Sequence, residues 1–103
     1  MKTEPLASHE LALIEKIFAR HPEVRDVTLF GSRAKGTHRP NSDVDLSVRG
    51  KLTALQTEAL ASELDELPLP YHFDVLAFDL ITSQPLREHI ERVGIVIYPA
   101  RRA

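Results

Sequence analysis

Two aspartates separated by a single residue are the first feature of this sequence that could perform chemistry. Asp43 and Asp45 stand at the start of the apolar segment 44–48, which is typical of a buried β-strand. Side chains two residues apart on a strand point to the same face, about 7 Å apart. Two carboxylates in that position repel each other unless a divalent cation lies between them. We therefore expect a Mg²⁺ site, because Mg²⁺ prefers oxygen ligands and shares them with nucleotide phosphates.

Asp74 is the candidate third carboxylate. It interrupts an apolar segment between Phe73 and Val75, where burying a charge without a partner is costly. If its strand lies beside the strand of Asp45, three carboxylates surround two metal ions and clamp an in-line phosphoryl displacement. Asp74 is then the residue expected to help deprotonate the attacking hydroxyl. The neighbouring His72 is interpreted as a surface or strand-edge residue.

A glycine and a serine precede this acidic pair by about ten residues. Gly31 permits a tight turn and a close approach of the backbone to a ligand. The amides that open a short helix there, with the Ser32 hydroxyl, are expected to bind the β- and γ-phosphates of a nucleotide. Arg33 and Lys35 would add charge-assisted contacts to those phosphates. Taken alone, either residue is more typical of a surface charge.

The elements that must position these residues follow from apolar periodicity and from turn-forming residues. Helices and strands alternate along the whole chain, so we expect an α/β fold with helices flanking one small mixed sheet in a single domain, 1–103. The expected elements are a helix Ser8–Arg20 capped by Ser8, a strand Asp26–Phe30, a short helix 32–36, a strand Val44–Val48, a helix capped by Thr53 and closed by Pro68, a strand Phe73–Phe78, a helix capped by Thr82 or Ser83 and stopped by Gly94, and a strand Ile95–Tyr98.

Composition narrows the functional classes. The 103 residues carry a formal net charge of −2, so a strongly basic surface for nucleic acid is not indicated for this chain alone. The absence of cysteine excludes disulfides, thiol nucleophiles and thiolate zinc sites. No apolar run reaches the roughly 20 residues that span a bilayer, and the N-terminus lacks the apolar stretch of a secretory signal. We expect a soluble, cytoplasmic domain.

The glycine–serine motif, the aspartate pair and Asp74 together are a more specific signal than an isolated pair of aspartates. The segments 31–36 (GSRAKG) and 42–46 (SDVDL), with Asp74 on a later strand, resemble the signature of the DNA polymerase β-type nucleotidyltransferase superfamily, and most closely its minimal nucleotidyltransferase (MNT) branch. The resemblance extends over most of the chain and implies the polymerase β-like fold in a minimal version. By position, it implies triphosphate binding by Gly31 and Ser32 and metal binding by three carboxylates, Asp43, Asp45 and Asp74.

The resemblance also implies a partner and a reaction. Members of this branch form toxin–antitoxin pairs with a small helical HEPN-domain protein, as hetero-oligomers in which the nucleotidyltransferase is the antitoxin. Characterised relatives transfer AMP from ATP to a tyrosine of the HEPN ribonuclease. The chain is thus expected to be a Mg²⁺-dependent protein adenylyltransferase that uses ATP.

Two alternatives remain open. In the first, the chain is a binding module that neutralises a toxin by covering its surface, and the motif is a relic or an NTP sensor. In the second, it is a nucleotidyltransferase with another acceptor, either a tRNA end or a small molecule. Substituting Asp43 and Asp45 by asparagine separates the first alternative from the enzyme, because neutralisation by surface covering would survive.

Overall fold

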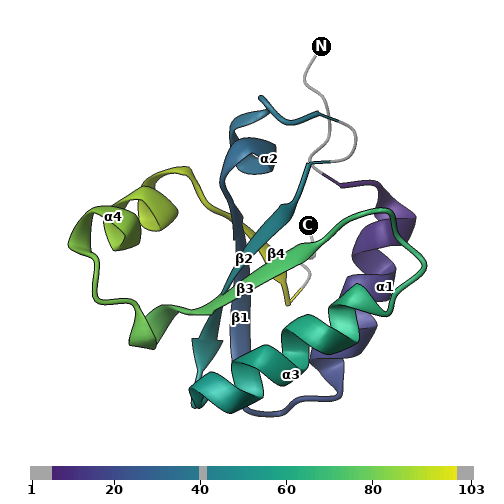
Figure 1. Ribbon diagram of the computed structural model, residues 1–103, viewed down its shortest axis with the longest axis horizontal. Coiled ribbons are helices and arrows are strands. Elements are labelled where there is room, and N and C mark those ends of the chain that lie inside the picture. The colour runs from purple at the N-terminus through teal and green to yellow at the C-terminus, as the bar shows by residue number, and fades with distance from the viewer. Residues whose placement is uncertain (1–5, 40–41, 100–103) are drawn as a thin grey trace.

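Helices and strands alternate along the chain and build one four-stranded sheet with helices on both faces (Figure 1). The computed structural model describes residues 6–39 and 42–99. The elements are α1 (Ser8–Ala19), β1 (Val24–Phe30), α2 (Ser32–Lys35), β2 (Val44–Gly50), α3 (Ala54–Asp65), β3 (Phe73–Ala77), the 3₁₀ helix η1 (Phe78–Leu80), α4 (Gln84–Val93) and β4 (Ile95–Tyr98).

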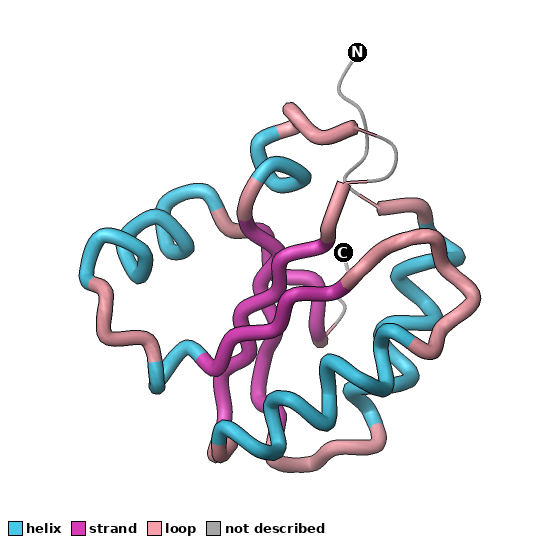
Figure 2. The backbone as a smooth tube through the Cα atoms, viewed as in Figure 1, coloured by secondary structure: helices cyan, strands magenta, loops and turns pink. Residues whose placement is uncertain are grey.

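The sheet is mixed, as the alternating pattern predicts, and its strand order is β3-β2-β1-β4. Strand β1 pairs antiparallel with both β2 and β4. Strands β2 and β3 are parallel, and α3 forms the crossover between them. Strand β3 therefore lies at one edge of the sheet, and β2 lies next to it in the interior (Figure 2).

The hydrophobic core lies between the sheet and the helix pair α1 and α3, which pack together on one face. Alternate side chains of β2 enter this core, and Val44, Leu46 and Val48 are almost fully buried. The remaining β2 side chains, among them Asp45, therefore point to the opposite face. Helix α4 covers part of that face, where Ile90 packs with Phe30 and Phe78.

Most element boundaries agree with the predicted ones, and the differences have physical reasons. Ser8 is the first residue of α1, and the N-cap position is held by Ala7, whose N–H donates to the Glu10 carboxylate at 2.9 Å. Strand β1 begins at Val24, two residues earlier than expected, because Val24 pairs with Gly50 across a bulge. Such pairing is a tertiary effect that local pattern does not reveal.

No helix in the described part of the chain is both long enough and apolar enough to cross a bilayer.

Candidate active site

Gly31 forms the turn between β1 and α2 and lies directly against Asp45. Its φ of 78° and ψ of −154° belong to a region that residues with a side chain rarely adopt. A Cβ atom at this position would collide with the Asp45 carboxylate. The backbone approaches the Asp45 side chain because no side chain stands between them, and the predicted close approach of Gly31 to a bound ligand stays a prediction. Ser32, half-buried, follows as the first residue of α2.

Asp45 and Asp74 are direct neighbours on the parallel strands β2 and β3. Both lie on the sheet face opposite the α1–α3 core, because their strand neighbours Val44 and Phe73 point into that core. Asp43 stands two residues before Asp45, immediately ahead of β2, and is exposed. The structure therefore places Asp45 and Asp74 side by side on one face of the sheet, with Asp43 just before the strand of Asp45; that the three bind metal together stays a prediction.

The three negative charges affect each other. Burial raises the pKa of the Asp45 carboxyl above its usual value, and the charges of Asp74 and Asp43 raise it further. Asp45 is the most enclosed of the three carboxylates, since Asp43 and Asp74 are exposed. A positive ion close to these oxygens would relieve the repulsion and favour the ionised form of Asp45.

The residues present fit a divalent cation in their chemistry. Across residues 6–39 and 42–99, no three Asp, Glu or His side chains are already grouped as the ligands of one metal ion. Carboxylate oxygens are nevertheless the ligands that Mg²⁺ prefers, and nucleotide phosphates normally complete its coordination. The repulsion at Asp45 suits a cation that arrives with a nucleotide.

His72 lies beside Asp74 and was interpreted from the sequence as a surface or edge residue. Its side chain is 61% exposed, which agrees with that interpretation. Its two ring nitrogens lie 3.4 Å from the carboxylates of Asp65 and of Asp74. The imidazole thus connects the end of α3 with the third carboxylate, a contact that sequence spacing did not indicate.

The burial of the Arg33 side chain is not predicted by the sequence. Its side chain is buried at 3% exposure, so it is not the surface charge that an isolated arginine would suggest. The guanidinium lies over the Tyr71 ring at 4.2 Å and donates hydrogen bonds to the Ser42 carbonyl. That Arg33 binds phosphate stays a prediction. Lys35, by contrast, is exposed at the last position of α2.

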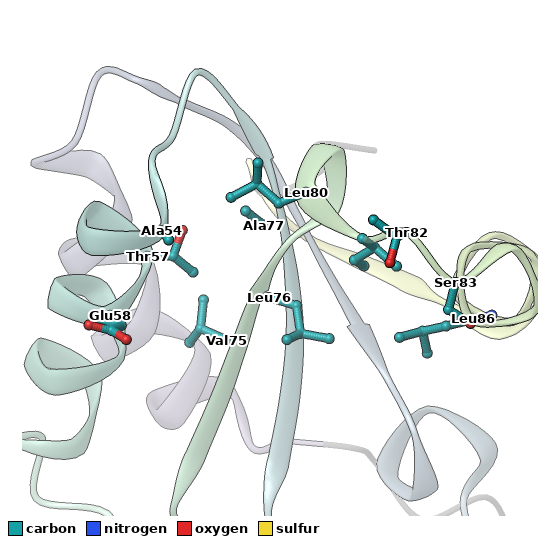
Figure 3. A pocket seen from close by; sticks show the side chains of 11 residues that line it. Ala54, Thr57, Glu58, Val75, Leu76, Ala77, Leu80, Thr82, Ser83 and Leu86 are labelled. Atoms are coloured by element: carbon teal, nitrogen blue, oxygen red, sulfur yellow. Dashed lines mark hydrogen bonds between the residues drawn. The ribbon is translucent and has the colours of Figure 1, made fainter.

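A separate apolar cleft of about 440 Å³ runs beside β3 between α3 and α4 (Figure 3). Leu76 and Leu86 extend into it from the β3 and α4 sides, and Val75 faces α3. None of the predicted site residues lines this cleft. Leu76 does follow Asp74 by two residues on β3, so the cleft and the acidic group share one strand.

Comparison with known proteins identifies relatives of this chain. Residues 13–103 match the family described as Polymerase beta, Nucleotidyltransferase. A protein of Haemophilus influenzae named probable protein adenylyltransferase MntA is 34% identical over 94 residues, a match that covers 89% of this chain and 82% of the relative.

Solved structures share the fold. A toxin–antitoxin crystal structure with AMP-PNP contains a chain that superposes with a TM-score of 0.72 at 22% identity, covering 90% of this chain and 73% of that one. An MNT antitoxin in complex with a tri-AMPylated HEPN toxin of Shewanella oneidensis gives a TM-score of 0.68 at 19% identity, covering 87% and 70%. At these identities the comparison shows a common fold.

Proposed function

The chain belongs to the polymerase β nucleotidyltransferase family, and from this premise we propose that it is a Mg²⁺-dependent protein adenylyltransferase acting as an antitoxin. It moves AMP from ATP to a tyrosine hydroxyl of a HEPN toxin. The observation that carries the proposal is the pairing of Asp45 with Asp74 across β2 and β3, with Gly31 packed against Asp45. This arrangement gathers carboxylates and a phosphate-accessible backbone at one end of the sheet.

The relatives support the choice of donor and partner. The H. influenzae relative is named a probable protein adenylyltransferase, and the match covers most of both chains. The related fold occurs in toxin–antitoxin complexes, one with AMP-PNP and one whose HEPN toxin is tri-AMPylated. ATP as donor and a HEPN protein as acceptor are the substrates that agree with all of these relatives.

Each residue of the proposed site has a role in the reaction that follows from its position. Gly31 and Ser32 bind the β- and γ-phosphates through backbone N–H groups and the serine hydroxyl, and the exposed Lys35 adds charge. Asp74, exposed on the edge strand, accepts the proton of the acceptor hydroxyl. The hydroxyl oxygen then bonds to the α-phosphorus while the α–β phosphoanhydride bond breaks, and pyrophosphate leaves with the displaced electron pair.

Asp43, Asp45 and Asp74 would hold the metal ions. Bound Mg²⁺ would supply charge stabilisation of the phosphates and a lower pKa of the attacking hydroxyl. Because burial and the neighbouring carboxylates raise the pKa of Asp45, this residue is the one whose ionised form depends most on a nearby cation. Substitution of Asp45 should therefore remove activity more completely than substitution of the exposed Asp43.

The test is transfer of label from ATP carrying ³²P at the α-phosphate. The purified protein is incubated with Mg²⁺, labelled ATP and a purified HEPN partner, beside the Asp43→Asn/Asp45→Asn double variant. We expect one labelled protein band that disappears with the double variant and with EDTA. Mass spectrometry of the labelled peptide then identifies the modified side chain, which we expect to be a tyrosine.

Neutralisation of the toxin in cells decides between the enzyme and the binding module. If the double variant neutralises as well as the wild type and no label reaches the partner, the antitoxin acts by covering the toxin and the proposal is wrong. Aspartate-dependent label on RNA or on a small molecule, with none on the partner, would also contradict it.

A further inference from the structure

We infer that Arg33 and Tyr71 are positioning residues that fix the separation of Asp43 from Asp74 and thereby set the affinity of the site for a divalent cation. The inference deepens the proposed function and rests on it for the identity of the site. The observation behind it is a buried contact between the segments that carry Gly31, Asp43 and Asp74.

Arg33 fixes the loop that leads into β2. Its Nε and one terminal nitrogen both donate to the Ser42 carbonyl, at 3.3 and 3.0 Å. Ser42 directly precedes Asp43, so the guanidinium holds the backbone one residue away from a predicted ligand. Arg33 itself directly follows Ser32. One side chain therefore links the phosphate-binding turn to the acidic pair.

Tyr71 fixes the loop that leads into β3. Its ring lies under the Arg33 guanidinium, 4.2 Å from the guanidinium carbon to the ring centroid. Its hydroxyl donates to the Glu10 carboxylate at 2.7 Å, and Glu10 in turn accepts the Ala7 N–H. Tyr71 stands three residues before Asp74, so the ring anchors the loop of the third carboxylate to α1.

The two loops meet just outside the first backbone hydrogen bond between β2 and β3. Val44 N–H donates to the His72 carbonyl at 3.0 Å, and the Arg33–Tyr71 stack lies beyond it. A backbone ladder fixes the strands but leaves the loop residues at its end free to move. The stack extends the fixed region to Ser42 and Tyr71, which flank the predicted ligands.

Arginine suits this role better than lysine. The guanidinium is planar, so it can lie flat on the Tyr71 ring while two of its N–H groups point to one carbonyl oxygen. An ammonium group can keep the charge but not this combination of contacts. The carboxylate of Glu10, buried at 8% exposure, contributes the opposite charge to the group. Charge-preserving Arg33→Lys is therefore the variant that separates geometry from electrostatics.

The experiment measures Mn²⁺ binding to the full chain without nucleotide, by the relaxation of water protons. Wild type is compared with Arg33→Lys and Tyr71→Leu, and Asp45→Asn identifies binding at the acidic group. We expect both loop variants to lose about tenfold in Mn²⁺ affinity, the effect usual for residues that orient metal ligands. In the transfer assay, their kcat should fall at low Mg²⁺ and recover as Mg²⁺ is raised, with KM for ATP unchanged.

The matched control is Arg87→Lys. Arg87 lies over the Phe78 ring at 4.3 Å and donates to the carbonyls of Phe78 and Ile81, so it has the same kind of environment beyond the other end of β3. We expect its replacement to leave Mn²⁺ affinity unchanged. Equal losses in Arg33→Lys, Tyr71→Leu and Arg87→Lys would show a general effect of substitution on folding and would overturn the inference.

Three other outcomes also test the positioning role of Arg33 and Tyr71. If Arg33→Lys binds Mn²⁺ like the wild type while KM for ATP rises, Arg33 is a phosphate ligand and the inference fails. If Arg33→Lys does not fold, Tyr71→Phe, which keeps the ring and removes the hydroxyl that donates to Glu10, must still weaken Mn²⁺ binding. If Mn²⁺ binding depends on Asp45 but no acceptor is labelled, the proposed function fails and the binding data still test the positioning role.

Discussion

At the scale of single residues, glycine is required at position 31 for two reasons, its backbone conformation and its contact with Asp45. Mutation can separate the two. Its φ of 78° and ψ of −154° lie in a region essentially confined to glycine and cost an alanine roughly 1–3 kcal/mol, and a Cβ would in addition displace the Asp45 carboxylate. We expect Gly31→Ala to lower the transfer rate by about 100-fold, because small displacements of reacting groups have effects of that size. Single-turnover transfer with labelled ATP measures the loss.

Gly36→Ala is the control for that prediction. Gly36 has the same φ of 78°, but a Cβ there meets nothing within 4 Å. Its ψ of 15° places Gly36 in the left-handed helical region, which is less restricted to glycine than the conformation of Gly31. We therefore expect a smaller loss of stability in urea and a transfer rate close to that of the wild type. Loss of activity in both variants would mean that backbone strain, and not the contact with Asp45, is responsible.

Glu10 makes stability depend on pH. Burial alone would raise its pKa, but the hydrogen bonds from Tyr71 and Ala7, with the charges of His9 and Arg33, lower it below the usual 4.5. Its contribution is therefore fully present above the unfolded pKa and is lost as the pH falls through the lower folded value. We expect Glu10→Gln to be less stable than the wild type at neutral pH, and the difference to shrink at about pH 3. Urea denaturation at both pH values measures this, and a constant difference would contradict it.

Sequence could predict the residues of the site whose signal is local. Asp43 and Asp45 are two residues apart, and Gly31 follows an apolar strand, so residue type and spacing sufficed to predict their positions at the ends of β2 and β1, while their roles stay predictions. The burial of Arg33 could not be predicted, because it depends on Tyr71, which is 38 positions away in the chain and adjacent only after β2 and β3 pair. The sequence signal for this contact is weak: it is only that an aromatic residue, Tyr71, stands three positions before Asp74.

At the scale of elements, the cap of α3 is the clearest local determinant. Thr53 Oγ1 accepts the Gln56 N–H at 3.1 Å, and the Gln56 side chain accepts the Thr53 N–H at 2.9 Å. We expect Thr53→Ala to lower the free energy of unfolding by about 1 kcal/mol. Thr82→Ala, in the loop before α4, should change it little, since Ser83 is the cap there. Equal effects of the two substitutions in urea denaturation would refute this assignment.

The ends of the helices show which features local sequence can predict and which depend on packing. Thr53 as the cap of α3 was predicted correctly, and Ser83 proved to be the cap of α4 from the two candidates. Gly94 ends α4 with a φ of −67°, so it does not act through a left-handed turn. A Cβ at Gly94 would collide with the Ile90 carbonyl and the Thr28 methyl group. Its requirement for glycine comes from packing against β1, which the sequence alone does not show.

At the scale of the whole molecule, stability depends mainly on the larger core between the sheet and α1 with α3, since the cluster of Phe30, Phe78 and Ile90 on the other face is small. Leu46, on the central strand β2, is fully buried in that core. We expect Leu46→Ala to lower the free energy of unfolding by about 3 kcal/mol, within the range for buried leucines. Leu55→Ala, at a position 75% exposed on α3, should have almost no effect. Urea denaturation distinguishes them, and a similar loss in both would show that the core is not where we place it.

The alternation of elements predicted a mixed sheet with helices, but it did not fix the strand order. Sequential strands often pair, and β1–β2 and β2–β3 do so. Strand β4 instead returns to pair with β1, and this pairing depends on where α4 packs. Nothing in the short segment Ile95–Tyr98 distinguishes one edge of the sheet from the other.

The parallel pairing of β2 with β3 also determines the order in which the parts of the site come together during synthesis. Strands β1 and β2 are joined by residues 31–43, which include α2, and pair antiparallel, so a chain growing on the ribosome can form them before β3 is made. Asp74 reaches Asp45 only after the 22 residues 51–72, including α3, have emerged and crossed the sheet. A chain interrupted before β3 carries the proposed phosphate-binding turn and two of the three predicted metal ligands without the third. In the proposed site, synthesis therefore supplies Asp74 after the other predicted ligands.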